Sequence, residues 1–345
     1  MPKVKLQDIA HICGVDISTV SRGMRGDPRV KPKTRKQIEE TAHRLGYRPN
    51  LIARNLAGGK THTLWIILPS VDASIDHRLV RHASHAAAKH GYTLFAALHD
   101  CDNFGTQSHN DLANYERVLA MAAQGTTDGL LIIPRRGADD AALLQDLVRD
   151  KFPMVFLDNF AESLPNPVVT TDNRTAAKVL TENCLKAGAT GVILLFDEPN
   201  PVARARLAGA RAALEEARSV RYINQSQWEA QPDVAALGLG DTVAIIGSSQ
   251  SGHIQPLTDN YGAKLASSRL LFGVFDQWTG SPAPAQNVFV ALQDCETLAQ
   301  LAVERLIALI EGHPTTGERV QQIPAQVMLS HAVPPLFISI DKTAS

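Results

Sequence analysis

Residues 6–22 read LQDIAHICGVDISTVSR, and this stretch decides how the N-terminal part of the chain folds. Its apolar residues recur every three or four positions up to Cys13, which is the period of one face of an amphipathic helix. Gly14 suits the left-handed conformation that closes a helix, and Asp16 or Ser18 can cap a second helix, in which Val20 points inward. Helix, glycine turn and helix form the motif that presents a recognition helix to the major groove of DNA.

The residues that follow support the same organisation. Ile38, Ala42 and Leu45 lie on one stripe of a third predicted helix over 34–47, which completes a three-helix core. Residues 51–59 are compatible with a helix but end in two glycines. Because isolated helices shorter than about 12 residues are marginal in water, we expect this segment to be ordered only with a partner.

Charge is distributed unevenly along the chain. The 345 residues have a net charge of −1, but residues 1–60 hold 13 Lys and Arg against 5 Asp and Glu, a net charge of +8. The remaining residues carry −9. A basic segment on an acidic body suits binding of a polyanion, since phosphate contacts need local positive charge. A solvated basic tail would show the same charge.

Cysteine usage and hydropathy narrow the class of protein. The four cysteines are far apart and form no CxxC pair, so neither a zinc site nor a disulfide framework is predicted. The first residues lack the apolar core of a signal peptide, and the apolar runs are too short to span a membrane. We expect a cytoplasmic protein with no cofactor, no metal and no membrane partner.

After residue 60 the pattern changes to apolar runs that alternate with amphipathic stretches. The predicted strands are 64–68, 92–98, 129–133, 154–158, 191–196, 242–247 and 270–275, and the predicted helices are 77–90, 108–124, 138–150, 173–187, 201–217 and 294–311. Alternation of strand and helix predicts an α/β body with parallel sheets covered by helices on both faces. The body is longer than a single sheet of this kind needs, so more than one sheet is expected.

The N-terminal residues resemble the head of LacI/GalR-family transcriptional regulators. The resemblance rests on residues 6–22, on Val30, on Thr34-Arg35, on GYRPN at 46–50 and on Ala53 with LAG at 56–58. It implies a DNA-binding domain over 1–58, with a helix-turn-helix over 3–48 and a hinge helix over 50–58. In that family the hinge folds in the minor groove when two subunits meet on an operator, so the expected partners are double-stranded operator DNA and a second copy of the chain.

The resemblance assigns roles in DNA binding to individual positions. Ile17, Ser18 and Arg22 would face base edges, and the arginine fork matches the two acceptors of guanine. Thr19, Ser21 and Asn50 are better placed for phosphates or minor-groove edges, which position the protein without reading sequence. Leu56 would wedge between base pairs. The complete expected set is Leu6, Ile17, Ser18, Thr19, Ser21, Arg22, Arg25, Asn50, Ala53 and Leu56; each could instead be a solvated or packing side chain.

The body resembles the same family more loosely, at 156–158, 172, 202–209 and 273–276. This resemblance implies the two-lobed fold of periplasmic sugar-binding proteins (type I), with a ligand between the lobes. The chain would cross between lobes near residues 160, 290 and 322. The effector-binding and dimerisation domain would then cover 61–345, with one lobe from about 61–160 and 291–322 and the other from about 161–290 and 323–340.

A sugar-like effector needs charged side chains that bond to neighbouring hydroxyls. Arg206 can donate two hydrogen bonds, and Asp276, directly after a predicted strand, can accept from two hydroxyls. Side chains that follow strands of open α/β sheets are the natural ligand contacts. With positions matched to the family, the expected effector residues are Asp72, Ile75, Asp76, Asp158, Thr170, Asn200, Arg206, Trp228, Ser248 and Asp276. A surface ion pair is the alternative for Arg206 and Asp276.

Three departures from the family pattern affect these expectations. Gly23-Met24-Arg25 replaces two apolar residues and an asparagine, which suggests a recognition helix that ends early at Gly23 and an Arg25 that contacts phosphate. Lys31-Pro32 keeps a good first helical residue but loses a serine cap. Ser248-Ser249 stands where relatives have Asn-Asp, so a usual effector donor is missing.

Three other motifs partly match the patterns of competing functions. GSSQS at 247–251 lacks the second glycine of a hydrolase nucleophile elbow, and Gly59-Lys60-Thr61 precedes a strand where a phosphate-binding loop would follow one. His82 and His85 share a helix face with His77 and His90 nearby, yet no third metal ligand is evident. The sequence therefore predicts a DNA-binding regulator that is not an enzyme, acts as a repressor and is controlled by an effector. The alternative is a DNA-binding head fused to an enzymatic α/β body.

Overall fold

The computed structural model describes residues 4–24, 26–47, 60–68, 74–98, 109–134, 141–196, 200–217, 220–224, 238–247, 269–276, 287–313 and 317–329. The chain divides into two compact units, residues 1–61 and 62–345, which we call the head and the body. The head is all-α and the body contains two sheets covered by helices. The expected fold class, an α-helical head and a two-lobed α/β body, is confirmed.

The head contains three short helices, α1 (Leu6–Cys13), α2 (Ile17–Met24) and α3 (Pro32–Arg44). Gly14 ends α1 in the left-handed conformation with φ of 66°, as the sequence predicts. Ile9, Val20 and Ile38 are fully buried, one from each helix, and form the centre of the core. Pro32 begins α3 at its first turn and no side chain caps that helix, which agrees with the lost serine.

Helix α2 ends at Met24, one residue beyond the predicted end at Gly23, so Gly23 lies in its last turn. A Cβ at Gly23 would lie 2.8 Å from the Cδ1 atom of Ile38, and the glycine is buried. The missing side chain therefore lets α3 pack closely on α2, and this packing outweighs the low helix propensity of glycine. Gly23, which departs from the family pattern, is thus part of the core of the head.

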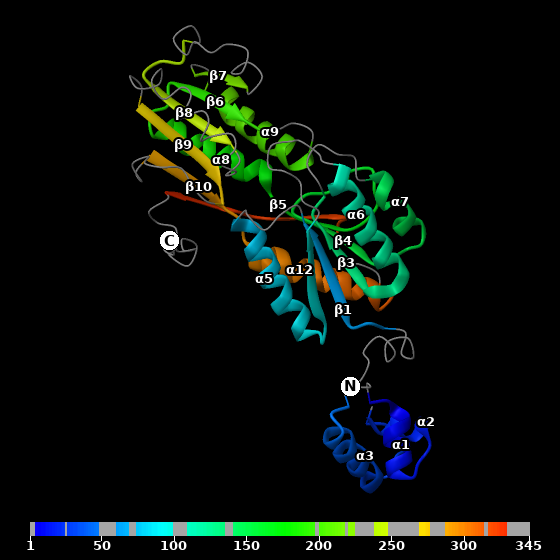
Figure 1. Cartoon of the computed structure of the whole chain (residues 1–345). Coiled ribbons are helices and arrows are strands. Elements are labelled where there is room, and N and C mark those ends of the chain that lie inside the picture. Colours follow the sequence, from blue (N-terminus) through cyan, green and yellow to red (C-terminus); the bar gives the residue numbers. More distant parts are fainter. Residues whose placement is uncertain are drawn as a thin grey trace. The chain divides into compact units, whose positions relative to one another are not determined.

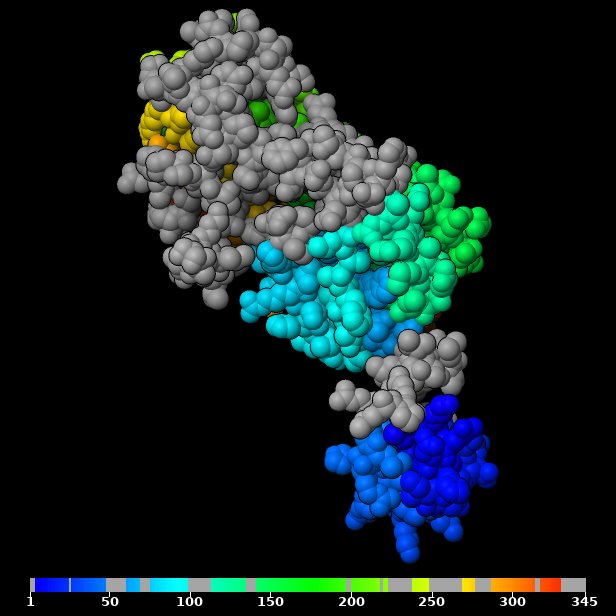
Figure 2. All heavy atoms as spheres, viewed as in Figure 1, coloured from blue at the N-terminus to red at the C-terminus, as the bar shows by residue number. Residues whose placement is uncertain are grey.

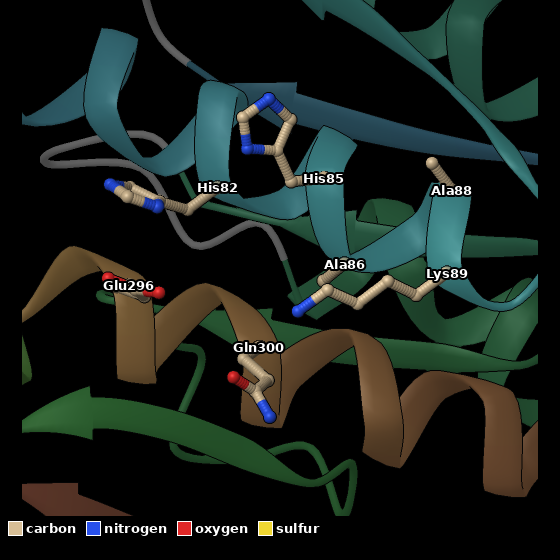
Figure 3. A pocket seen from close by; sticks show the side chains of 7 residues that line it. All are labelled: His82, His85, Ala86, Ala88, Lys89, Glu296 and Gln300. Atoms are coloured by element: carbon tan, nitrogen blue, oxygen red, sulfur yellow. The ribbon is translucent and has the colours of Figure 1, made fainter.

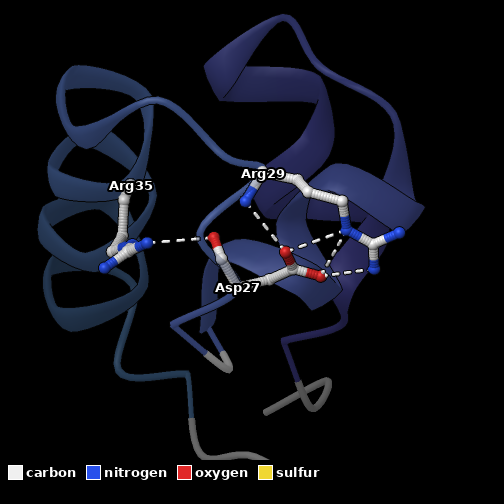
Figure 4. A network of polar contacts seen from close by, with 3 residues as sticks. All are labelled: Asp27, Arg29 and Arg35. Carbon is white, nitrogen blue, oxygen red and sulfur yellow. Dashed lines mark hydrogen bonds and ion pairs between the residues drawn. The ribbon is translucent and has the colours of Figure 1, made fainter.

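A polar network fixes the loop between α2 and α3 (Figure 4). The guanidinium of Arg29 donates to both carboxylate oxygens of Asp27 at 2.7–3.2 Å, and Arg35 on α3 donates to the Asp27 carbonyl at 2.9 Å. The hydrogen bonds from Arg29 hold the pKa of Asp27 well below its usual range. Hydrogen bonds within the loop and to α3 thus hold the loop in place.

The first sheet of the body has the strand order β11-β5-β4-β3-β1-β2, and each neighbouring pair is parallel. Its strands are β1 (Thr63–Leu68), β2 (Thr93–Leu98), β3 (Gly129–Ile132), β4 (Met154–Leu157), β5 (Val168–Thr171) and β11 (Val320–Ile323). The central strands β3, β4 and β5 are buried on both faces, as continuous apolar runs in parallel sheets should be.

Helices cover both faces of the first sheet (Figure 1). On one face, α5 (Ser74–Lys89) and α12 (Cys295–Ile310) share a core with alternate residues of the central strands. On the other face lie α6 (His109–Met121), which runs on through a π-helical turn over Ala122–Thr126, and α7 (Ala141–Arg149). Figure 2 shows the outer surface of this lobe, on which residues 74–98 are cyan and residues 109–134 are teal. No helix within the described ranges is both long and apolar enough to cross a membrane.

The second sheet has the order β12-β10-β9-β8-β6-β7. Its strands are β6 (Gly191–Leu195), β7 (Arg221–Asn224), β8 (Thr242–Gly247), β9 (Arg269–Phe275), β10 (Val288–Leu292) and β12 (Gln326–Leu329). One face is covered by α8 (Asn173–Lys186) and α9 (Pro201–Glu216). The edge strand β12 runs antiparallel to β10, so this sheet departs from the expected all-parallel arrangement.

The chain passes between the two sheets at three described places. It crosses after β5 into α8, after β10 into α12, and between β11 and β12. The expected first crossing near residue 160 is too early, because β5 pairs with β4 and β11 in the first sheet and the chain leaves that sheet at Asp172. Asp172 and Asp294 each cap the helix that follows a crossing, accepting from Thr175 N and Thr297 N respectively.

Helix α9 packs closely on α8 at Gly209. A Cβ at this position would lie 2.0 Å from the carbonyl oxygen of Arg174, the second residue of α8. Only glycine fits here without moving a backbone, and the close approach brings the preceding turn of α9, which carries Arg206, onto the start of α8.

We expect Gly209→Ala to destabilise the body by about 1–3 kcal/mol, because the added methyl group overlaps a backbone atom. At an unconstrained helical position the same change would stabilise by about 1 kcal/mol. Ala208 is exposed and supplies the control: Ala208→Gly should lower the free energy of unfolding only by the difference in helix propensity, about 1 kcal/mol. Urea unfolding of the three proteins measures both effects, and a higher unfolding midpoint for Gly209→Ala would contradict the packing argument.

Candidate functional site

The exposed side of α2 is the candidate nucleic-acid surface of the head. Ile17 is 43% exposed although it is a large apolar residue, and Ser18 and Arg22 are exposed, whereas Val20 is fully buried. The three predicted base-reading side chains are therefore all available to a partner. The fully buried Val20 confirms the predicted inward face of the helix.

The other predicted DNA contacts vary in exposure. Thr19 and Ser21 are half-buried, and Leu6 is half-buried against the core of the head, which gives it a packing role as well. Arg25, Asn50, Ala53 and Leu56, together with the expected hinge helix, lie outside the described residues.

In the body, the crossings between the sheets carry a continuous set of buried polar side chains, which we call the crossover network. It consists of Arg78, Thr171, Asn173, Arg206, Asp276 and Gln293. All of these except Arg78 are buried, and the side chain of Arg78 is 16% exposed. The crossover network thus lies where the chain passes from β5 to α8 and from β10 to α12.

Arg206 begins the crossover network on the side of α9. Its Nε donates to Asn173 Oδ1 at 2.7 Å, and its guanidinium lies 3.7 Å from the centroid of the Phe275 ring. Asn173 in turn donates to the Thr171 carbonyl at 2.9 Å. The guanidinium is held by both a hydrogen bond and a cation–π contact, so its orientation is fixed.

Gln293 joins both crossings to Asp276. Its side-chain carbonyl accepts from the Thr171 hydroxyl, and its Nε2 donates to Asp276 Oδ2 at 2.8 Å. Gln293 is 1% exposed. Since Thr171 ends β5 and Gln293 follows β10, one amide links the two places where the chain changes lobe.

Asp276 lies directly after β9 with φ of 65°, a left-handed conformation that aspartate and asparagine tolerate better than most side chains. It is 5% exposed. Burial raises the pKa of Asp276 above its usual range, while Gln293, Arg206 and Arg78 act in the opposite direction. Its Oδ1 atom is buried and accepts no hydrogen bond among the described residues.

Arg78 reaches this carboxylate from α5 of the first lobe. Its Nη2 donates to the Gln293 carbonyl at 2.6 Å, and its Nη1 lies 4.0 Å from Asp276 Oδ1. Asp276 is thus flanked by two guanidinium groups from different lobes. Position, burial and charge together make this carboxylate suited to bind hydroxyl groups.

Asp158 occupies the equivalent position in the first sheet. It follows β4 with φ of 64°, and its backbone N–H donates to Val169 on the next strand, as that of Asp276 donates to Ala291. Burial raises the pKa of the Cys295 thiol, and the negative charges of Asp276 and Asp158 act in the same direction. The structure therefore places Arg206 and Asp276 in one buried set of polar side chains and puts Asp158 at the corresponding strand end of the first sheet.

Other predicted effector residues lie in supporting positions. Thr170 is 2% exposed and its hydroxyl donates to the Asp158 carbonyl at 2.5 Å. Asn200 caps α9, accepting from Ala203 N at 2.8 Å. Ile75 packs on the core of the first lobe, and Asp76 is buried in the first turn of α5. Asp72, Trp228 and Ser248 lie outside the described residues.

Sequence reasoning missed four members of the crossover network: Arg78, Thr171, Asn173 and Gln293. The signal for Gln293 was present, since it follows the apolar run VFVAL at 288–292, which was not predicted as a strand. Thr171 likewise ends a short strand that was not predicted. Arg78 carries no local signal, because only the tertiary packing of α5 on the crossings brings it to Asp276.

His82 and His85 of α5 line a shallow groove between α5 and α12. Figure 3 shows His82 directed toward Glu296 on α12 and His85 directed away from that helix. Burial lowers the pKa of His82. Among the described residues, no group of three or more His, Cys, Asp or Glu side chains is placed to hold a metal ion.

Comparison with known sequences gives matches to bacterial regulators. Residues 5–50 match the family described as "Bacterial regulatory proteins, lacI family". Catabolite control protein A of Priestia megaterium is 28% identical over 216 residues, covering 62% of this chain and 61% of that protein. The chain thus matches less than two thirds of the length of this relative. The regulator PtxS of Pseudomonas putida is 25% identical over 334 residues, covering 92% and 93%.

Solved structures share the fold at lower identity. The lac repressor dimer bound to operator and the anti-inducer ONPF has a TM-score of 0.72 at 20% identity, covering 94% of this chain and 98% of that one. The regulator CelR in complex with cellobiose has a TM-score of 0.60 at 19% identity, covering 95% and 99%. These likenesses show a common architecture of head and two-lobed body.

We expect Asp276→Asn to stabilise the protein against unfolding at neutral pH. The folded-state pKa of Asp276 is raised, so the ionised carboxylate is disfavoured by folding, and this penalty is present above the folded pKa. As the pH falls toward the unfolded value the wild type takes up a proton and the difference should shrink. Asparagine also tolerates the left-handed backbone.

Thermal or urea unfolding of the wild type and Asp276→Asn from about pH 7 to about pH 4 measures this change. Asp241→Asn, at an exposed position of the same lobe, is the control. A stability difference that grows on acidification would show that the charge is favoured in the folded state, contrary to this account.

Proposed function

We propose that this chain is a member of the LacI family of bacterial regulatory proteins and acts as a DNA-binding transcriptional repressor controlled by a sugar or sugar derivative. The observation that carries the proposal is the presence, in one chain, of a three-helix reading head and of a two-lobed body whose crossings hold the buried Arg206 and Asp276. The names of the relatives support it, since they are regulators.

The head supplies DNA recognition. Ile17, Ser18 and Arg22 on the exposed side of α2 contact base edges in the major groove, with Arg22 as the reader of guanine. Thr19 and Ser21 bind phosphates and fix the position of the helix. The protein binds a roughly palindromic operator as a homodimer, an assembly supported by the lac repressor dimer among its structural neighbours.

The body supplies control. Arg206 and Asp276 donate to and accept from neighbouring hydroxyls of the effector, and Asp158 adds a second carboxylate from the first sheet. The sugar-bound neighbour CelR supports this ligand class. Because Gln293 and Arg78 tie Asp276 to both lobes, ligand binding alters the fit between lobes and so the operator affinity. A coupling free energy of about 1–3 kcal/mol would change that affinity roughly 5- to 150-fold.

The enzymatic alternative receives less support. Both described buried thiols, Cys184 and Cys295, have pKa values raised by burial, which keeps them protonated and poorly nucleophilic at neutral pH. Most of the GSSQS segment lies outside the described residues. The regulator proposal, in contrast, uses the crossover network directly.

The proposal predicts two separable defects. Operator sites are first selected from random DNA with the full chain, and their affinity is then measured with glucose, ribose, cellobiose, gluconate and fructose 1-phosphate added singly. Arg22→Ala should weaken DNA binding at least tenfold, with thermal stabilisation by the active compound unchanged. Arg206→Ala should bind the operator normally and lose the response; Arg206→Lys tests whether charge alone suffices.

Failure to select any DNA would sink the DNA-binding function. A normal ligand response in both Arg206 variants would leave the function standing and refute the assigned effector site. Turnover of any compound in the panel would favour the enzymatic alternative.

A further inference from the structure

The ion pair between Arg204 and Glu162 is a contact between the lobes that the proposed function leaves unused. Nη2 of Arg204 donates to Oε2 of Glu162. Glu162 lies in the loop from β4 to β5 of the first sheet, and Arg204 lies near the start of α9, which covers the second sheet. The pair therefore joins the lobes at a place where the chain itself does not cross between them.

Each charge is presented by a segment that its own lobe holds in place. In the loop from β4 to β5, Leu164 is buried and its carbonyl accepts from Nη1 of Arg319, directly before β11, at 2.6 Å. In the second lobe, Asn200 caps α9, and its carbonyl accepts from the backbone N–H of Arg204 at 3.1 Å. The distance between the two charges therefore depends on how the lobes stand relative to each other.

Exposure distinguishes this pair from the crossover network. The side chains of Arg204 and Glu162 are 44% and 59% exposed, whereas Gln293 is 1% exposed. An exposed ion pair forms and breaks with a small change in free energy, because both charges keep most of their water. Breaking a buried hydrogen bond costs more. When the lobes move, the exposed pair can open while the hydrogen bonds at the crossings remain.

The pair lies beside the side chains that are proposed to bind the effector. Glu162 follows Asp158 by four residues in the loop after β4, and Arg204 precedes Arg206 by two residues in the helix after β6. Ligands of α/β sheets bind beyond the carboxyl ends of the strands, which is where both segments begin. The arrangement of lobes that forms the ion pair thus also brings together the two segments that carry Asp158 and Arg206.

We propose that Arg204 and Glu162 are positioning residues of the effector site, whose ion pair fastens the two lobes around the bound effector. This inference rests on the proposed function and deepens it to the regulation of the same site. A contact that forms only in the arrangement that holds the ligand adds its free energy to the ligand affinity. The two side chains act by holding the lobes together, without touching the ligand.

Ionic strength supplies the readout, because a neutral sugar carries no charge that salt can screen. Glucose, galactose, ribose and cellobiose are screened against the full-length chain, and the sugar bound most tightly is titrated by calorimetry at about 20 mM and about 500 mM NaCl. The wild type should bind about 2- to 5-fold more weakly at the higher salt, the range expected for an exposed ion pair. Glu162→Gln should show the weaker affinity already at the lower salt, with no further change when salt is added.

Reversing both charges separates ion pairing from other effects of the substitutions. The double variant Glu162→Arg with Arg204→Glu should recover most of the wild-type affinity and its salt dependence, because the two charges attract again. Asp146→Asn is the matched control, since Asp146 pairs with Arg149 within α7 and this exposed pair does not join the lobes. It should bind the sugar as the wild type does at both salt concentrations.

The outcomes separate the inference from the function beneath it. Equal affinity of the wild type and Glu162→Gln at low salt would overturn the inference, as would an equal salt dependence of the two proteins. A loss in Glu162→Gln that the charge reversal does not repair would show a role other than ion pairing and overturn it too. In these cases the proposed function stands, because the sugar still binds. If no sugar binds the wild type while selected DNA still does, the proposed ligand class fails and takes this inference with it.

Discussion

The geometry of the crossings in the body depends on the two hydrogen bonds made by the side-chain amide of Gln293. The amide bonds to Thr171 at the end of β5 and to Asp276 at the end of β9, while the backbone carbonyl of the same residue receives Arg78 from α5. A buried amide that is 1% exposed and satisfied at both ends is costly to disturb, because each broken bond leaves a polar atom without water. The geometry of both crossings is therefore specified together.

Glycines and caps place the charged groups around that amide. Gly209 lets α9 approach the backbone of α8, and this contact brings Arg206 to Asn173. Asp172 and Asp294 begin the helices that follow the two crossings, so each crossing is short and well defined. The result is a buried carboxylate whose ionised form is disfavoured by burial, as is common where stability is traded for binding.

Much of this arrangement could be predicted from the sequence, and the failures have physical reasons. The helices of the head and most of the body follow from apolar periodicity, and Arg206, Asp158 and Asp276 follow from strand ends and from a family resemblance. Strand β5 reads VVTT and was missed because only two of its four residues are apolar, whereas the equally short β3 and β4 are apolar almost throughout; the predicted first crossing therefore fell about ten residues too early. Arg78 and Gln293 acquire their roles only through tertiary contacts between segments over 200 residues apart.

The most direct test of the account is the coupling between ligand and operator in Gln293→Met, which keeps the length of the side chain and removes its hydrogen bonds. Operator affinity would be measured with and without a saturating active sugar, for this variant and for the wild type. The account predicts that the variant still binds both partners, while the ratio of operator affinities falls close to one. A ratio equal to that of the wild type would show that the lobes communicate by another route, and would contradict the central role given to Gln293.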